Sequence, residues 1–135
     1  MMIVRSANHK DLDFLLEMDK HISYESLQEA IEGGRIYILE EENQRIGWLR
    51  YNLFWDNTPF LNMLFILKDF RKKGYGRTLV EYWETQMKNR GYTVGLTSTL
   101  VHEDAIHFYM QFGYQPVGGF HPNEEEYEII LKKVF

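Results

Sequence analysis

The stretch from residue 60 to residue 97 constrains the fold more than any other part of the chain. A nearly unbroken apolar segment, residues 60–67, is typical of a strand that is covered on both faces. It runs into a turn with two glycines and four basic residues, and then into an amphipathic helix that ends near Gly91. A second strand is predicted at residues 92–97. The stretch is therefore expected to form a β-α-β unit with parallel strands and a right-handed crossover.

The turn between the first strand and the helix has the features of a phosphate-binding site. Gly74 and Gly76 have no Cβ, so the backbone can approach a ligand closely there. The main-chain amides of the turn and of the first helical turn would point at an anion, and the helix dipole would add to the attraction. Mobile countercharge would come from the four basic side chains, Arg71, Lys72, Lys73 and Arg77.

Two well-known phosphate motifs do not fit this turn. A nucleotide-hydrolase P-loop needs lysine after its last glycine, but Gly76 is followed by Arg77. A dinucleotide-binding turn needs a third glycine at the position of Leu79. An ordinary turn rich in glycine and basic residues remains an alternative.

Two motifs together resemble those of the GCN5-related N-acetyltransferase (GNAT) family. The pattern Arg-x-x-Gly-x-Gly at residues 71–76 resembles the loop that holds the pyrophosphate of acetyl-coenzyme A in that family. About thirty residues downstream, residues 105–114 (AIHFYMQFGY) match the family pattern Ala-x-x-Phe-Tyr-x-x-x-Gly-Phe/Tyr. The order and spacing of the two motifs agree with the family, and the specific resemblance covers roughly residues 60–118.

The rest of the chain supplies the elements that such a fold needs. Asn8 is predicted to cap a first helix, and Gly33 with Gly34 to end a second one. We expect strands at 3–5, 35–40, 45–54, 60–67, 92–97, 114–117 and 127–134, helices near 9–18, 24–32, 78–90 and 103–112, and loops at 55–59 and 118–126. The fold class is α/β (α+β): one domain, residues 1–135, with a mixed, mostly antiparallel central sheet of about six to seven strands flanked by helices.

The resemblance implies an acetyl-coenzyme A-dependent N-acetyltransferase. Acetyl would pass directly to a primary amine while both substrates are bound. The implied cofactor-binding residues are the main chain of Leu64, Phe65 and Ile66, the turn Arg71, Lys72, Lys73, Gly74, Tyr75, Gly76 and Arg77, and His102, where relatives often have asparagine.

Tyr109 occupies the position of the family's catalytic tyrosine, which protonates the leaving thiolate. It also lies on the apolar face of the predicted helix, so a core tyrosine with a satisfied hydroxyl is the alternative. Relatives often carry, on one of two strands, a glutamate that acts as the general base. The matching positions here are Phe60 and Thr97. No residue is therefore assigned as the base, and Glu103 is expected to cap a helix or face solvent.

The implied acceptor pocket lies at residues 19–24 and 118–126, with Trp55 and Asp56 as further candidates. The run of three glutamates at 124–126 either attracts an amine or forms a solvated loop. The acceptor itself, a small molecule or a peptide, stays open.

Composition narrows the partners and the location. The net charge of −5 argues against nucleic acid, and the absence of cysteine excludes disulfides and thiolate chemistry. No run has the length of a membrane span or the form of a signal peptide, so we expect a cytoplasmic monomer or homodimer. The histidines show no metal-ligand spacing. The alternatives are a catalytically inactive coenzyme A-binding module and a protein-interaction domain.

Overall fold

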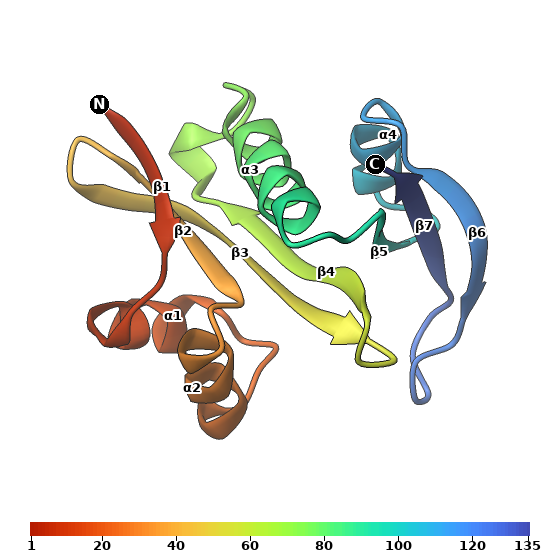
Figure 1. Cartoon of the computed structure of the whole chain (residues 1–135), viewed down its shortest axis with the longest axis horizontal. Coiled ribbons are helices and arrows are strands. Elements are labelled where there is room, and N and C mark those ends of the chain that lie inside the picture. Colours follow the sequence, from red (N-terminus) through yellow and green to blue (C-terminus); the bar gives the residue numbers. More distant parts are fainter. The chain divides into compact units, whose positions relative to one another are not determined.

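The computed structural model describes all 135 residues and contains the predicted elements in the predicted order (Figure 1). The strands form a seven-stranded sheet in the order β1-β2-β3-β4-β5-β7-β6, in which β4 and β5 are parallel. The pairs β1/β2, β2/β3, β5/β7 and β6/β7 are antiparallel, which confirms the expected mixed sheet. The elements are β1 (Met2–Ser6), α1 (Leu12–Met18), α2 (Tyr24–Glu32), β2 (Ile36–Glu41), β3 (Gln44–Phe54), β4 (Thr58–Ile66), α3 (Tyr75–Asn89), β5 (Val94–Leu100), α4 (Ala105–Met110), β6 (Gln115–Phe120) and β7 (Glu128–Val134), with short 3-10 helices at His9–Asp11 and Lys68–Phe70.

The chain contains two compact units. The first unit comprises Met1–Asn52 and Met63–Trp83, and the second comprises Leu53–Asn62 and Glu84–Phe135. Each is described by itself below, and the single domain expected over residues 1–135 stays a prediction. No helix has both the length and the apolar character needed to span a bilayer.

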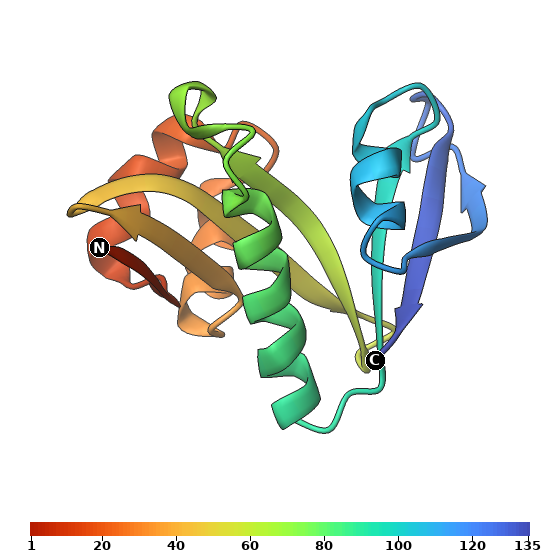
Figure 2. The same ribbon diagram turned by 90° about the horizontal axis from the view of Figure 1, so that it is seen from above.

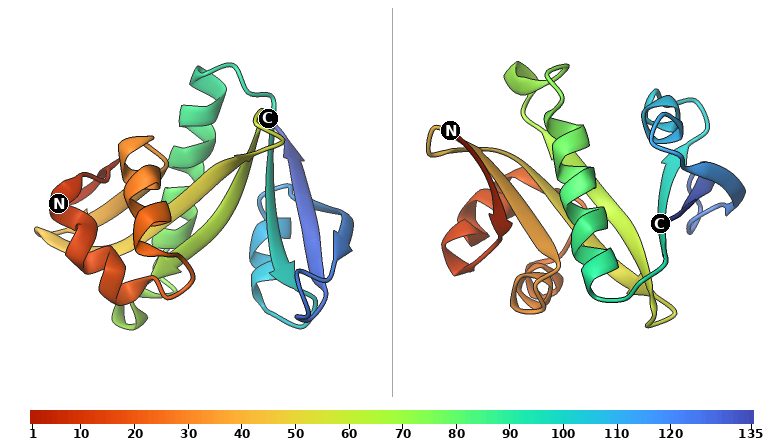
Figure 3. Two further views of the ribbon diagram at one scale, coloured as in Figure 1. Left: turned by 90° about the horizontal axis from the view of Figure 1, so that it is seen from below. Right: turned by 45° about the horizontal axis from the view of Figure 1, so that its top comes forward.

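The core of the first unit follows from the alternation of side chains along β2 and β3. Ile36 and Ile38 on β2, with Trp48 on β3, face α1 and α2 and pack with Leu15 and Leu27. The intervening residues pack against the first half of α3: Tyr37 meets Tyr82 at 5.0 Å between ring centroids, and Tyr51 meets Trp83 at 6.1 Å. Figures 1 and 3 show α1 and α2 on one face of these strands and the start of α3 on the other. Both faces of β2 and β3 are therefore buried.

Gly47 sets how closely β3 can approach the end of β4. A Cβ on Gly47 would lie 2.6 Å from Ile66 Cδ1 and 2.7 Å from the Phe65 carbonyl oxygen. The Leu67 amide donates to the Ile46 carbonyl at 2.8 Å just beyond this point. Any larger residue at position 47 would push β4 away, so glycine is required here.

The second unit packs α4 against β5, with β7 next to β5 and β6 at the edge (Figure 2). Its buried residues include Tyr109, Tyr114 and Leu131. Gly113, in the turn that follows α4, adopts the left-handed conformation with φ of 93°. The predicted helix and strands of this part of the chain are thus present.

Some boundaries differ from the predictions, chiefly near turn residues. The loop expected at 55–59 is shorter, because Trp55 and Asp56 form a tight left-handed turn (φ 54° and 65°) and β4 already begins at Thr58. Pro59, expected within that loop, is the second residue of β4, near the strand's start, where proline is tolerated. The helix expected at 103–112 is limited to Ala105–Met110, and β6 extends to Phe120 into the predicted loop.

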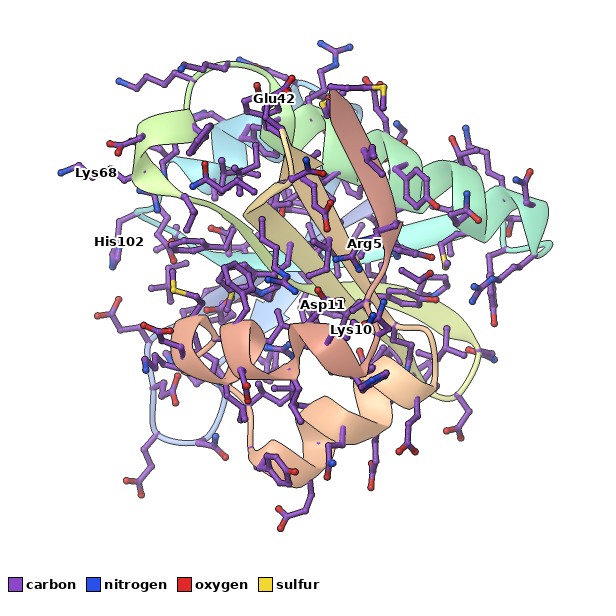
Figure 4. All side chains as sticks on the ribbon, turned by 90° about the vertical axis from the view of Figure 1, so that its left-hand side faces the viewer. Arg5, Lys10, Asp11, Glu42, Lys68 and His102 are labelled. Carbon is purple, nitrogen blue, oxygen red and sulfur yellow. The ribbon has the colours of Figure 1, made fainter.

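A buried carboxylate holds the N-terminal strand to the first helical segment. Asp11 is fully buried and accepts two hydrogen bonds of 2.8 Å from Arg5 and one of 2.7 Å from Arg45 Nε. It also accepts the Asn8 amide at 2.8 Å, which completes a capping box with the predicted cap Asn8. Figure 4 shows Arg5 and Asp11 side by side. Burial alone would raise the pKa of Asp11, but the hydrogen bonds from Arg5, Asn8 and Arg45 outweigh it and hold the pKa well below its usual range.

Asp11→Asn is expected to lower the free energy of unfolding at pH 7 by about 2–3 kcal/mol, because hydrogen bonds to a charged group are lost. The folded-state pKa of Asp11 is depressed, so its stabilisation is present above a pH of about 4 and is lost as the pH falls further. Urea unfolding at pH 7 and pH 3 should therefore show a smaller pH dependence in the variant. Asp13→Asn, at an exposed position of α1, is the control. An equal loss in both variants would contradict this role of Asp11.

Candidate functional site

The predicted phosphate turn lies in the first unit, between the end of β4 and α3. Its backbone enters the left-handed region twice, at Lys72 (φ 61°) and Gly74 (φ 85°). Nothing lies within 4 Å of the position that a Cβ on Gly74 would occupy. The glycine is thus needed for its backbone conformation and leaves the space above the turn open. Lys72 makes a second left-handed residue, which sequence reasoning did not anticipate.

Helix α3 starts inside this turn. The Gly74 carbonyl accepts the Thr78 amide and the Thr78 hydroxyl, both at 3.1 Å. The amides of Tyr75 and Gly76 precede that first bond and have no intrahelical acceptor. Gly76 is therefore the second residue of the helix rather than a loop residue. These amides and the positive end of α3 favour an anion at this position.

The four basic side chains of the turn differ in how free they are. Arg71 Nε donates to the Ile66 carbonyl at 2.8 Å, and its guanidinium lies 5.0 Å from the centre of the Phe65 ring. Arg77 pairs with Glu81 at 2.7 Å across one turn of α3. Lys72 and Lys73 are exposed, so the mobile countercharge expected from all four residues rests mainly on these two lysines.

Arg71 also connects the turn to the segment that the resemblance assigned to the pantetheine arm. Phe65 stacks on Trp48 with ring centroids 4.8 Å apart, and Ile66 is buried. Leu64 is partly buried. The structure therefore brings Phe65, Ile66 and Arg71 together. The side-chain contacts of these residues hold the main chain at the end of β4 in place.

Tyr75 attaches the turn to the β2–β3 hairpin. Its hydroxyl donates to Glu41 Oε2 at 3.1 Å, and this hydrogen bond raises the pKa of Tyr75. Its ring lies 6.4 Å from that of Phe70. Sequence reasoning missed Glu41, because no local pattern links residues that are 34 positions apart.

The predicted acid, Tyr109, lies on α4 in the second unit. Its side chain is only 5% exposed, and its ring meets that of Tyr114 edge-on at 5.6 Å. Burial raises the pKa of Tyr109 to about 12, and a hydrogen bond with the Thr97 side chain acts in the opposite direction. A phenol with this pKa is fully protonated at neutral pH. The hydroxyl can therefore donate a proton or a hydrogen bond.

A second buried polar group lies beside Tyr109. Tyr114 donates to Glu84 Oε2 at 2.7 Å, and Lys133 Nζ donates to Glu84 Oε1 at 2.8 Å. Burial, together with the bond to Glu84, raises the pKa of Tyr114. Sequence reasoning missed Glu84, which reads as a surface residue of an amphipathic helix until its partners are known.

The remaining candidates in the second unit lie at its surface. His102 Nε2 is 2.6 Å from Glu126 Oε2, and both side chains are mostly exposed. Glu103 accepts the Leu100 amide at 3.3 Å and faces solvent, whereas Asp104 occupies the N-cap position of α4. The structure contains no group of three or more His, Cys, Asp or Glu side chains that could hold a metal ion.

Part of the implied acceptor region is rigidly held within the first unit. Asp19, at the end of α1, is buried and accepts Arg50 Nε at 3.0 Å. Its other oxygen accepts the His21 amide at 3.2 Å, and Ser23 caps α2. The break between α1 and α2 therefore has a defined conformation.

Comparison with known proteins identifies the family. The family model described as "Acetyltransferase (GNAT) family" matches residues 5–114. The chain belongs to the GNAT family. This confirms the resemblance seen in the two sequence motifs.

Individual relatives agree with this assignment. The uncharacterized protein YyaT of Bacillus subtilis is 35% identical over 101 residues, which are 73% of this chain and 63% of YyaT. The chain thus spans less than two thirds of that relative. The ribosomal-protein-S18-alanine N-acetyltransferase of Escherichia coli shares 18% identity with a TM-score of 0.83, over 99% of this chain and 94% of that one. A GNAT family acetyltransferase from Elizabethkingia anophelis with acetyl-CoA bound shares 17% identity with a TM-score of 0.77, over 99% and 98% of the two chains. These two structures confirm the fold.

Gly74→Ala tests whether the turn binds the coenzyme of this family. A left-handed conformation costs an alanine about 1–2 kcal/mol, so the free turn should relax and binding must restore it. We expect acetyl-CoA to bind about tenfold more weakly, as measured by titration calorimetry. Gly34→Ala is the matched control, since Gly34 also has positive φ (70°) and open space around it but lies at the end of α2. Equal affinity of both variants would argue against the turn as the binding site.

Proposed function

We propose that this protein is an N-acetyltransferase that moves an acetyl group from acetyl-CoA to a primary amine by direct transfer, with both substrates bound. The observation that carries the proposal is the turn before α3 in a chain of the GNAT family. This turn presents the N-terminus of α3, an open left-handed glycine and two exposed lysines. These groups suit a diphosphate. The GNAT structure from E. anophelis holds acetyl-CoA, which supports the same ligand here.

The roles of the residues follow from this proposal. The amides from Lys72 to Arg77 hold the diphosphate, and Lys72 and Lys73 add charge. The main chain of Leu64, Phe65 and Ile66 holds the pantetheine arm, and one of its amides polarises the thioester carbonyl. Acetyl-CoA supplies an activated acyl group with a thiolate leaving group. His102 stays a candidate contact to the coenzyme, now with Glu126 as its partner.

Tyr109 acts as the proton donor in this scheme. As the amine nitrogen bonds to the acyl carbon and the carbon–sulfur bond breaks, the Tyr109 hydroxyl gives its proton to the sulfur. The amine must lose a proton as well, and presenting a neutral lysine-like amine at pH 7 costs about 4–5 kcal/mol. Phe60 and Thr97 offer no basic group, so we assign no residue to this step and route the proton to water.

The acceptor is a small-molecule or peptide amine. A thiol-release assay narrows the identity of the acceptor most directly. Its panel of amines contains a peptide N-terminus, a lysine side chain, a polyamine and an amino sugar. The missing carboxylates at Phe60 and Thr97 favour one alternative, a coenzyme A-binding module without catalysis. That alternative predicts calorimetric binding of acetyl-CoA but no free thiol with any amine.

Tyr109→Phe is expected to lower kcat by roughly 100-fold, as the loss of a general acid does, and to leave the affinity for acetyl-CoA unchanged. Free thiol released at saturating acetyl-CoA measures this. Tyr114→Phe is the matched control, because it removes the hydroxyl of the neighbouring ring, which bonds to Glu84. An unchanged kcat in Tyr109→Phe would remove the proposed acid role.

A further inference from the structure

The sheet of the second unit has one face that helices cover. Every second residue of β5 is buried, and Lys133 of β7 pairs with Gly95 on that buried face. Lys133 donates to Glu84 of α3 at 2.8 Å, and Glu84 also accepts the Tyr114 hydroxyl at 2.7 Å. The Tyr114 ring meets Tyr109 of α4 edge-on. Helix α4 and the end of α3 therefore lie on the same face of this sheet.

The opposite face of this sheet, called the uncovered face below, is mostly apolar. The strand register places on it Phe60 of β4, Val94, Leu96 and Leu100 of β5, Ile130 and Val134 of β7, and Phe120 of β6. Val134 is 70% exposed and Phe120 is 50% exposed, and the others are partly buried. On β5 the usual pattern is reversed, because the threonines lie on the buried face and the leucines on the uncovered one. A contiguous apolar face of this kind is typical of an interaction surface.

Two opposite charges flank the centre of the uncovered face. Glu128 and Lys132 lie two residues before and two residues after Ile130 on β7, so all three side chains point to the same side of the sheet. The two charged residues are about 13 Å apart along the strand, too far to pair with each other. Neither forms an ion pair within the chain. Both charges are therefore available to a partner.

A two-fold axis would set each of these charges against its opposite. The axis lies in the plane of the interface, perpendicular to β7 and level with Ile130, so the two β7 strands run antiparallel across it. Glu128 then faces Lys132 of the second copy, and Lys132 faces Glu128 of the second copy. On β5, Leu96 is level with Lys132 and Leu100 is level with Glu128, so Leu96 faces Leu100 of the second copy. The uncovered face thus has the self-complementarity that an isologous interface requires.

We propose that the uncovered face is an interface between two copies of this chain. The sheets pack face to face, with Ile130 of each copy at the centre and two reciprocal pairs between Glu128 and Lys132. An unrelated partner would not require the charges of this chain to be spaced evenly about Ile130. The inference goes beyond the proposed function and is independent of it, because the test needs no acetyl-CoA.

Sedimentation velocity over a range of protein concentrations tests this interface. We expect the wild type to dimerise with a dissociation constant in the micromolar range. Glu128→Lys and Lys132→Glu each place like charges opposite one another twice, so each should raise the dissociation constant by about 100-fold. Glu17→Lys makes the same change of charge at an exposed position of α1 and should dimerise like the wild type. Circular dichroism checks that every variant is folded.

Mixing the two variants tests the symmetry of the interface. In an equimolar mixture of Glu128→Lys and Lys132→Glu, two lysines of one copy face two glutamates of the other, so a heterodimer should form from chains that are monomeric alone. If either reversal variant is unfolded, Glu128→Gln and Lys132→Gln replace the pair, and each should raise the dissociation constant about tenfold. A wild type that is monomeric at every concentration would overturn the inference. So would a dimer that these variants leave intact, or a mixture of folded reversal variants that stays monomeric.

Discussion

The left-handed backbone at Lys72 and Gly74 is the constraint on which the candidate site depends. It turns the chain from β4 into α3 within a few residues and leaves the first amides of α3 without an intrahelical acceptor. Buried amides in this state would be costly, so the turn stays open above Gly74 and two lysines stand next to it. Arg71 holds the turn to Ile66, and Tyr75 holds it to Glu41. Both contacts lie within the first unit and hold the turn in place.

Much of this arrangement could be predicted from the sequence because its signals are local. The second helix spans the predicted residues 24–32 and ends at the glycine pair, and the β2–β3 turn at Glu42 and Asn43 adopts the left-handed conformations of a two-residue hairpin. The boundaries of β4, near Pro59, and of the short helix α4 were less predictable. Pro59 was expected in a loop but lies in β4, and the helix expected at 103–112 is limited to Ala105–Met110, with Asp104 at its N-cap position.

The side-chain partners could not be predicted, because they join distant parts of the chain. Thr97 and the Leu61 carbonyl are 36 residues apart, and Tyr114 and Glu84 are 30 residues apart. From the sequence alone, a threonine in an apolar strand is interpreted only as a β-branched residue. A glutamate in an amphipathic helix is interpreted only as a surface residue. Their roles appear once folding buries both and each needs a hydrogen-bond partner. The sequence motif drew attention to Tyr109, but not to the Tyr114 ring that packs against it.

Burial decides the chemistry open to Tyr109. The side chain is 5% exposed, and burial raises its pKa to about 12, so the hydroxyl is protonated at neutral pH. In the proposed reaction it can donate a proton, but it cannot serve as the base for the amine. Phe60 and Thr97 carry no ionisable group, so the proposed function leaves the deprotonation of the amine to water.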